Sequence, residues 1–285
     1  MAQEPENRML FDLRGRRKRV IQVIYVILAV IMAASLVVIG LPGGVNPFGN
    51  STAVNQDVAE VNLERAEDLQ QQLQTQPNNE TAAVDLIRAR FAAGQSLYDT
   101  DPETGQTSIT DEATTQLDLA ADAWTRYLKM VNNNPDPEVA QLMAQVLFTL
   151  SQGSTVAQFQ ANIKDAAQAQ QFVADEAIRQ QQKNNGPSAA NQLITLSMYQ
   201  LYAQNYEAAE KTRQKALAST DDADEKKQIN QAFNSSEKDA KRVGKLIDRA
   251  IKQARKDGGK SLENPLGSLG SDTSIGGDST GNTAP

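Results

Sequence analysis

The sequence of 285 residues contains no histidine and no cysteine. Histidine is the most common general base and a frequent zinc ligand, whereas cysteine supplies thiolate nucleophiles, disulfides and metal ligands. Their absence excludes Ser–His and Cys–His catalysis and most zinc sites. Carboxylates and hydroxyls remain, but no pair of carboxylates has a spacing that stands out. We therefore predict that the protein is not an enzyme and has no catalytic, cofactor-binding or metal-binding residues.

Aromatic residues are also scarce, at 5% of the chain, although hydrophobic residues make up 40%. Alanine and glutamine are abundant, and both favour helices. Strands, in contrast, are enriched in aromatic and β-branched residues. The composition therefore predicts an all-α protein.

One long stretch, residues 20–41, contains no charged residue. About 22 residues with a rise of 1.5 Å each cover roughly 33 Å, which is enough to cross a hydrocarbon core of about 30 Å. We therefore predict a transmembrane helix that contacts the lipid bilayer. Five basic residues lie between positions 14 and 19, and no further Lys or Arg occurs until Arg65. By the positive-inside rule, the basic segment 1–19 is cytoplasmic.

This topology predicts a single-pass protein of the cytoplasmic membrane whose C-terminal domain is extracytoplasmic. The alternative is a cleaved signal peptide. Against it, the apolar run is longer than the usual 7–15 residues of a signal-peptide core, and no clear small-x-small cleavage site follows it. We therefore favour an uncleaved signal anchor.

Two segments beyond the span have compositions that are typical of unfolded chain. Residues 42–56 are rich in Gly, Pro and Asn and predict a flexible linker. Residues 258–285 are rich in Gly and Ser and contain no aromatic residue, which predicts a disordered tail. The range 57–257 between them is long enough to form one domain.

Apolar residues at helical spacing recur through 57–257 and are separated by turns that contain Pro, Gly or Asn. The last helix has a candidate interruption near Asn234, Ser235 and Ser236. The expected helices begin near Asp57, after Pro77, at Asp111, at Glu138, near Ala157, at Ser188, at Tyr206 and near Asp224. Successive helix–turn–helix units predict an α-solenoid, in which each hairpin buries its apolar side against the next.

One hairpin has the spacing of a specific repeat. It contains a bulky residue, then Leu and a small residue on the first helix, followed by Tyr, Ala and Ala-Leu on the second. These positions are Leu193, Leu196, Ser197, Tyr206, Ala209, Ala216 and Leu217. The pattern resembles the tetratricopeptide repeat (TPR) family, a 34-residue helix hairpin. Gln200 and Asp221 depart from it, because the family usually has an aromatic residue and a proline there.

Two further stretches are similar to parts of this repeat. Ala120 and Trp124 match its second helix, and Pro77 to Gly94 has the spacing from one repeat's final proline to the next repeat's central glycine. The resemblance implies degenerate TPR-like hairpins over about 180 residues. The alternative is a generic helical bundle that uses alanine for close packing.

In the TPR family a peptide or helix lies in a groove lined mainly by the first helix of each hairpin. The resemblance therefore implies a protein or peptide client and a groove formed by polar residues of the first helices. The candidate groove residues are Arg88, Arg90, Gln141, Gln145, Asn191 and Gln192. We expect a membrane-anchored scaffold or chaperone-like accessory of a bacterial cell envelope. The alternative is a structural, self-associating envelope component without a client groove.

Charge is distributed unevenly along the chain. The formal net charge is −7, but residues 1–19 carry +3, so the remainder carries −10. An acidic external region repels phosphate backbones, and we therefore expect no nucleic-acid partner. Residues 238–256 reverse the trend, with eight basic and two acidic groups. Their apolar stripe predicts a terminal helix that packs on the last repeat, and their charge suggests a contact with anionic lipid.

The loop 99–112 has oxygen-bearing side chains at alternate positions, as calcium loops do. However, Thr104 stands where an EF-hand needs glycine, and Thr110 where it needs a bidentate glutamate. The pattern favours an ordinary surface turn over a calcium site.

Overall fold

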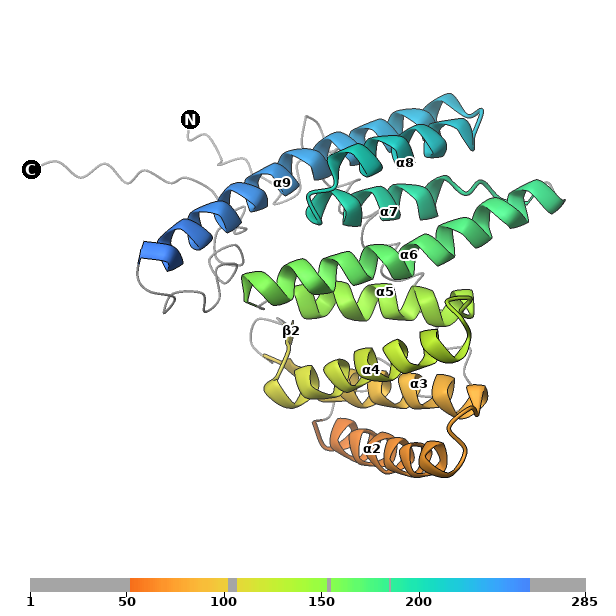
Figure 1. The fold of residues 1–285 in the computed structure, drawn as a ribbon, viewed down its shortest axis with the longest axis vertical. Coiled ribbons are helices and arrows are strands. Elements are labelled where there is room, and N and C mark those ends of the chain that lie inside the picture. Colours follow the sequence, from red (N-terminus) through yellow and green to blue (C-terminus); the bar gives the residue numbers. More distant parts are fainter. Residues whose placement is uncertain (1–51, 102–106, 153–154, 185, 257–285) are drawn as a thin grey trace, which may run out of the picture. The chain divides into compact units, whose positions relative to one another are not determined.

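The computed structural model describes residues 52–101, 107–152, 155–184 and 186–256. Within these ranges the protein is all-α apart from one pair of two-residue strands, which confirms the predicted fold class (Figure 1). The helices are α2 (Thr52–Thr75), α3 (Glu80–Ser96), α4 (Asp111–Met130), α5 (Pro137–Ser151), α6 (Val156–Asn184), α7 (Ala190–Tyr202), α8 (Tyr206–Ala218) and α9 (Ala223–Lys256). The strands are β1 (Asp99–Thr100) and β2 (Thr107–Ser108), which pair antiparallel.

The segment 1–19, the predicted span 20–41 and the tail 258–285 lie outside the described residues. Among the helices that are described, none is long and apolar enough to cross a membrane. Helix α2 begins at Thr52, so the last residues of the predicted linker 42–56 are helical instead.

Side-chain caps fix where several helices begin. The first backbone N–H groups of a helix lack an internal partner, and a side-chain oxygen at the N-cap satisfies one of them. Asn79 accepts a hydrogen bond from the amide of Ala82 at 3.1 Å, and Asn205 accepts one from the amide of Ala208 at 3.3 Å. Asp136 caps α5 in the same way, with Pro137 in the first turn, where its missing N–H costs nothing. These capped turns separate consecutive helices.

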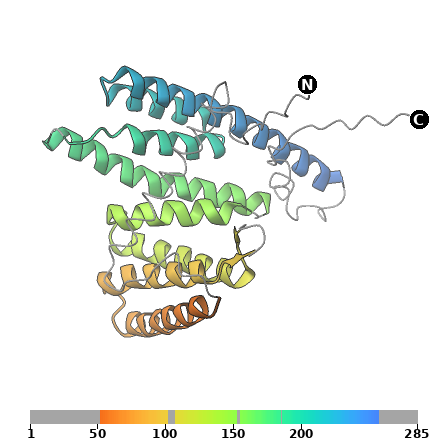
Figure 2. The ribbon, with the colours of Figure 1, turned by 180° about the vertical axis from the view of Figure 1, so that it is seen from behind.

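Six of the helices form three hairpins, α3–α4, α5–α6 and α7–α8, and each of these six packs most extensively against its hairpin partner. Helix α2 precedes the stack and packs against α3, whereas α9 follows it and packs mainly against α7. Both ribbon views show the helices stacked from α2 to α9 (Figure 1 and Figure 2). This is the architecture of a helical repeat.

Side-chain contacts link the first helices of the three hairpins, α3, α5 and α7. Arg88 on α3 forms an ion pair with Glu138 on α5 at 3.7 Å. The ring of Phe148 on α5 stacks on Tyr199 of α7, with 5.2 Å between the ring centroids. These contacts connect α3 to α5 and α5 to α7. Helix α9 in turn packs on α7.

Small residues allow the helices to approach closely. The residues that were assigned to repeat packing are nearly all buried, and only Tyr206 and Leu217 are half-buried. The buried set is Ala120, Trp124, Leu193, Leu196, Ser197, Ala209 and Ala216. At the interface of α3 and α4, a Cβ atom added to Gly94 would lie 2.9 Å from Cδ2 of Leu117. Helix α3 continues through this glycine to Ser96.

Tyr127 anchors the turn between α4 and α5. Its side chain is fully buried, and its hydroxyl accepts a hydrogen bond from the amide of Asp136 at 3.0 Å. Trp124 packs beside it, with 5.8 Å between the ring centroids. In the turn itself, Asn132 and Asn133 have φ angles of 51° and 57°, a left-handed conformation that asparagine tolerates better than most residues. The tyrosine therefore links the core to the position at which α5 begins.

One local prediction was wrong. Helix α9 is continuous and shows no interruption at Asn234–Ser236, because Phe233 and Ala240 on either side are buried against the preceding hairpin. The guanidinium of Arg213 on α8 also lies over the ring of Phe233, at 5.1 Å from its centroid. The predicted surface turn at 99–112 contains the strand pair β1–β2. The hydroxyl of Thr110 closes its base by donating to the carbonyl of Leu97 at 2.9 Å.

Candidate binding surfaces

The first surface is the solvent-facing side of α3, α5 and α7, called here the first-helix surface. Four of the six predicted groove residues are accessible on these helices. Arg88 and Gln141 are half-buried, whereas Gln145 and Asn191 are exposed. Because Arg88 pairs with Glu138 at the start of α5, the polar residues of α3 and α5 lie on the same side of the stack.

Partly exposed apolar side chains accompany these polar residues. Val84 and Phe91 lie four residues before and three residues after Arg88, so they share its side of α3. On α5, Leu142 and Phe148 lie three residues before and three residues after Gln145 and are half-buried. On α7, Met198 lies seven residues after Asn191, which is two helical turns, and Tyr202 follows one turn later; both are half-buried. Sequence reasoning missed all six, because it selected only polar residues. Their helical spacing was the signal that could have identified them.

Arg90 does not belong to this surface, which corrects the prediction. It is 7% exposed and lies between α2, α3 and α4. Its guanidinium donates to the side-chain oxygen of Gln116 on α4 at 2.8 Å and to that of Gln70 on α2 at 3.1 Å. Positions two apart on a helix differ by about 200° in direction, so Arg88 and Arg90 cannot share one face.

Gln192 likewise supports packing. Its backbone carbonyl and side-chain oxygen both accept from the amide nitrogen of Gln170, which is buried on α6. The contact joins α6 to α7 and leaves Gln192 half-buried. Of the two predicted α7 residues, only Asn191 is therefore free to present its side chain to solvent.

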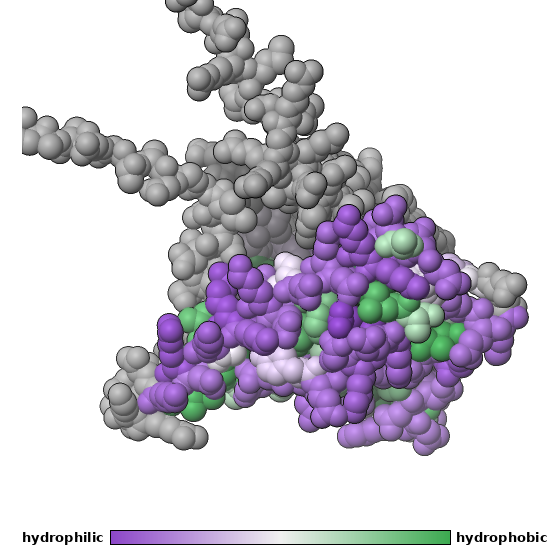
Figure 3. All heavy atoms as spheres, turned by 90° about the horizontal axis from the view of Figure 1, so that it is seen from above, coloured by the Kyte–Doolittle hydropathy of each residue, from purple (hydrophilic) through white to green (hydrophobic). Residues whose placement is uncertain are grey.

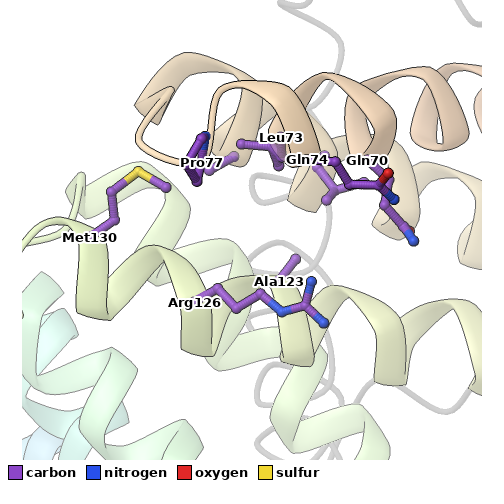
Figure 4. Close-up of a pocket in the computed structure, with 9 residues that line it drawn as sticks. Gln70, Leu73, Gln74, Pro77, Ala123, Arg126 and Met130 are labelled. Carbon is purple, nitrogen blue, oxygen red and sulfur yellow. The ribbon is translucent and has the colours of Figure 1, made fainter.

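The second surface is a groove between α2 and α4, called here the α2–α4 groove. It has a volume of about 290 Å³. Leu73, Pro77 and Met130 face one another across it, and Ala83, Leu86 and Ala123 form its floor (Figure 4). The polar lining consists of Gln70, Gln74 and Arg126. The groove was not predicted, because its two walls come from helices that are about 50 residues apart in sequence.

Charges of both signs lie around the groove, and Arg126 is the charged residue in its lining. Arg126 is exposed and forms no ion pair within the described residues. Arg90 lies behind Gln70, and its only side-chain hydrogen bonds go to two neutral amides. Burial lowers the pKa of Arg90, and the negative charge of Glu67 opposes that shift. Two cations thus border the groove in an otherwise acidic domain.

The third surface is the outer side of α9. Its apolar stripe is used for packing, since Ala240, Val243 and Ile247 are buried and Ala250 and Ile251 are half-buried. The basic side chains point away from this interface and are exposed. They are Lys238, Lys241, Arg242, Lys245, Arg249 and Lys252. Seen from the α9 end of the stack, the described surface is largely hydrophilic, with separate apolar spots (Figure 3).

Metal binding finds no support in the part of the chain that the structure describes, where no group of three or more His, Cys, Asp or Glu residues could hold an ion. Residues 102–106 of the candidate calcium loop lie outside that part.

The geometry is that of a helical repeat with three accessible surfaces and no cluster of catalytic groups among the described residues. No protein-family model, curated protein or solved structure matches the chain. The resemblance to the TPR family therefore stays a prediction from the sequence.

Proposed function

We propose that the protein is a membrane-anchored scaffold that binds a protein or peptide client through TPR-like hairpins. The observation that supports this proposal is the pair of side-chain contacts that link α3 to α5 and α5 to α7. Stacked hairpins of this kind create an extended surface on which a peptide or helix can lie. Half-buried apolar side chains alternate there with polar ones, as they do in recognition surfaces.

The residue types of the first-helix surface suit a protein client. Aromatic residues and methionine are enriched in protein interfaces, and Phe148, Tyr202 and Met198 provide them here. Gln141, Gln145 and Asn191 can donate to and accept from a peptide backbone. A client peptide could therefore pack its apolar side chains on the first group and form hydrogen bonds with the second.

In this proposal residues 20–41 hold the domain at the outer side of a bacterial cytoplasmic membrane, with residues 1–19 in the cytoplasm. The basic side of α9 adds a contact with anionic lipid, because several of its cations are exposed and outnumber its acidic groups. The bound client would then be held close to the envelope components that it assembles with.

Photo-crosslinking in native membranes tests this function. A benzophenone amino acid at Gln145 or Asn191 of the full-length protein should capture a client, because both residues are exposed on the first-helix surface. The same amino acid at Lys215, which is exposed on α8, should capture much less. Met198→Glu should reduce capture at Gln145 by placing a charge in the apolar strip.

Three outcomes would contradict this assignment. Equal capture at Lys215 would mean that the first-helix surface is not selective, and absence of capture at both test positions would mean that it has no client. Adducts that contain only a second copy of the chain would favour the self-associating envelope component instead.

A further inference from the structure

The α2–α4 groove exists because two helices pack on a third without meeting each other. Both α2 and α4 pack extensively on α3, and within the described residues they make no backbone contact with one another. The small side chains of Ala83 and Ala123 leave the space between them open. Figure 4 shows the side chains of α2 and α4 facing each other across this space.

The lining of the groove is apolar except at its rim. Leu73, Pro77 and Met130 form the walls over a floor that includes Leu86. Pockets for small ligands usually enclose about 300–1,000 Å³ and contain several converging polar groups. This groove has about 290 Å³, and its polar groups are only two glutamines and one arginine. Its size and lining suit a few apolar side chains of a larger partner better than a complete small ligand.

The charged residue at the rim of the groove indicates which kind of partner would bind there. Arg126 stands at the rim without an ion pair in the described residues, although Asp122 precedes it by one helical turn. Arg90 lies behind the wall residue Gln70, with amides as its only side-chain hydrogen-bond partners. A carboxylate placed at the rim would gain a direct pair with Arg126. The charge of Arg90 adds little, because Glu67 lies close enough to interact with it. A basic segment would be repelled by Arg126.

We propose that the α2–α4 groove is a second docking site, which binds an acidic amphipathic helix of a partner protein. The helix would place its apolar side chains between Leu73 and Met130 and a carboxylate on Arg126, in the helix-in-groove mode. Methionine suits this role, because its flexible side chain adapts to different apolar surfaces. The inference rests on the proposed binding function but concerns a surface other than the first-helix surface.

A pair of synthetic peptides tests the proposal. The probe is a fluorescein-labelled peptide of about 18 residues, long enough to populate a helix, with Leu along one side and Glu beside it. Its matched partner has Lys in place of every Glu. Each is titrated by fluorescence anisotropy against the full-length protein in nanodiscs of zwitterionic lipid. We expect the Glu peptide to bind and the Lys peptide not to bind.

Variants locate the binding. Arg126→Gln should weaken binding of the Glu peptide by about tenfold, since arginine is often a dominant residue in interfaces. Gln74→Trp should prevent binding by filling the groove. Lys129→Gln is the matched control, because Lys129 is exposed on the same helix and does not line the groove. The combined variant Lys241→Gln, Lys245→Gln and Arg249→Gln tests whether the Glu peptide is instead attracted to the basic side of α9. Both control proteins should bind the Glu peptide as the unaltered protein does.

Several results would overturn the proposal. They are equal binding of the two peptides, no binding of either peptide, no effect of Arg126→Gln, or loss of binding in the α9 variant. A benzophenone amino acid at Gln74 that captures only a second copy of the chain would assign the groove to self-association instead. Crosslinking from Gln145 should persist in the Arg126→Gln protein, so failure of the groove proposal is distinguishable from failure of the proposed function.

Discussion

Tyr127→Ala is expected to lower the free energy of unfolding by about 3–5 kcal/mol, the usual cost of deleting a large buried aromatic side chain. Tyr127 is fully buried and packs beside Trp124. The substitution also removes the partner of the Asp136 amide at the start of α5. The expected loss is a large fraction of the 5–15 kcal/mol that stabilises a typical domain.

Tyr127→Phe separates the two contributions. It keeps the ring and removes only the hydroxyl, so we expect a loss of about 1–2 kcal/mol. Trp124 is the only tryptophan in the chain, and its fluorescence during denaturant titration therefore reports on this domain alone. Tyr206→Ala is a suitable control, because Tyr206 is only half-buried. A loss below about 1 kcal/mol for Tyr127→Ala would contradict the role of this residue as the anchor of the turn.

Gly94→Leu is expected to destabilise the domain by more than about 3 kcal/mol, at or beyond the upper end of the range for overpacked cores. A Cβ atom at this position would lie 2.9 Å from Cδ2 of Leu117 and 3.3 Å from the backbone oxygen of Ala113. Leucine adds three further carbons, and α3 and α4 would have to move apart to accommodate them. Gly94→Ala should have a much smaller effect, because a gain in helix propensity of about 1 kcal/mol offsets the close contact.

Gly244→Ala on α9 provides the matched control. A Cβ atom there would meet only side-chain atoms of Gln204 and Tyr206, at 3.6 Å or more, which is an ordinary contact. We therefore expect it to stabilise the domain by up to about 1 kcal/mol through helix propensity. The unfolding midpoints of the three variants, measured by Trp124 fluorescence, check the set. Equal stability of the Gly94→Leu protein and the unaltered protein would show that the two helices are not closely packed at this position.

Helix existence and most helix starts were predictable from local sequence. Asn79, Asp136 and Asn205 cap helices that begin within one or two residues of the expected positions. A cap depends on only a few consecutive residues, so its signal is contained in the sequence. The spacing of apolar residues also marks the packed side of each helix. Burial of the repeat positions Leu193, Leu196 and Ala209 was therefore predictable.

Features that depend on distant contacts were not predictable. The Asn234–Ser236 stretch has weak helix propensity, but burial of Phe233 and Ala240 keeps α9 continuous. Arg90 was assigned to the groove as a polar residue of a first helix, yet Gln70 and Gln116 on two other helices accept its hydrogen bonds. The α2–α4 groove likewise depends on the packing of three helices and has no signature within any one of them.

The two ends of the described helix stack are held in place to very different extents. Among the described residues, α2 packs against α3 and its buried apolar side chains are the small ones of Ala59 and Ala66. Helix α9 packs against α6, α7 and α8 and buries larger side chains, among them Phe233 and Ile247. Local opening requires only the loss of the contacts that hold an element in place, so it costs less at α2. We therefore expect backbone amides in α2 to exchange with deuterium well before those in the first two-thirds of α9, without global unfolding. The arrangement makes α2 the detachable end of the stack, and the groove beside it would disappear and re-form with each such opening.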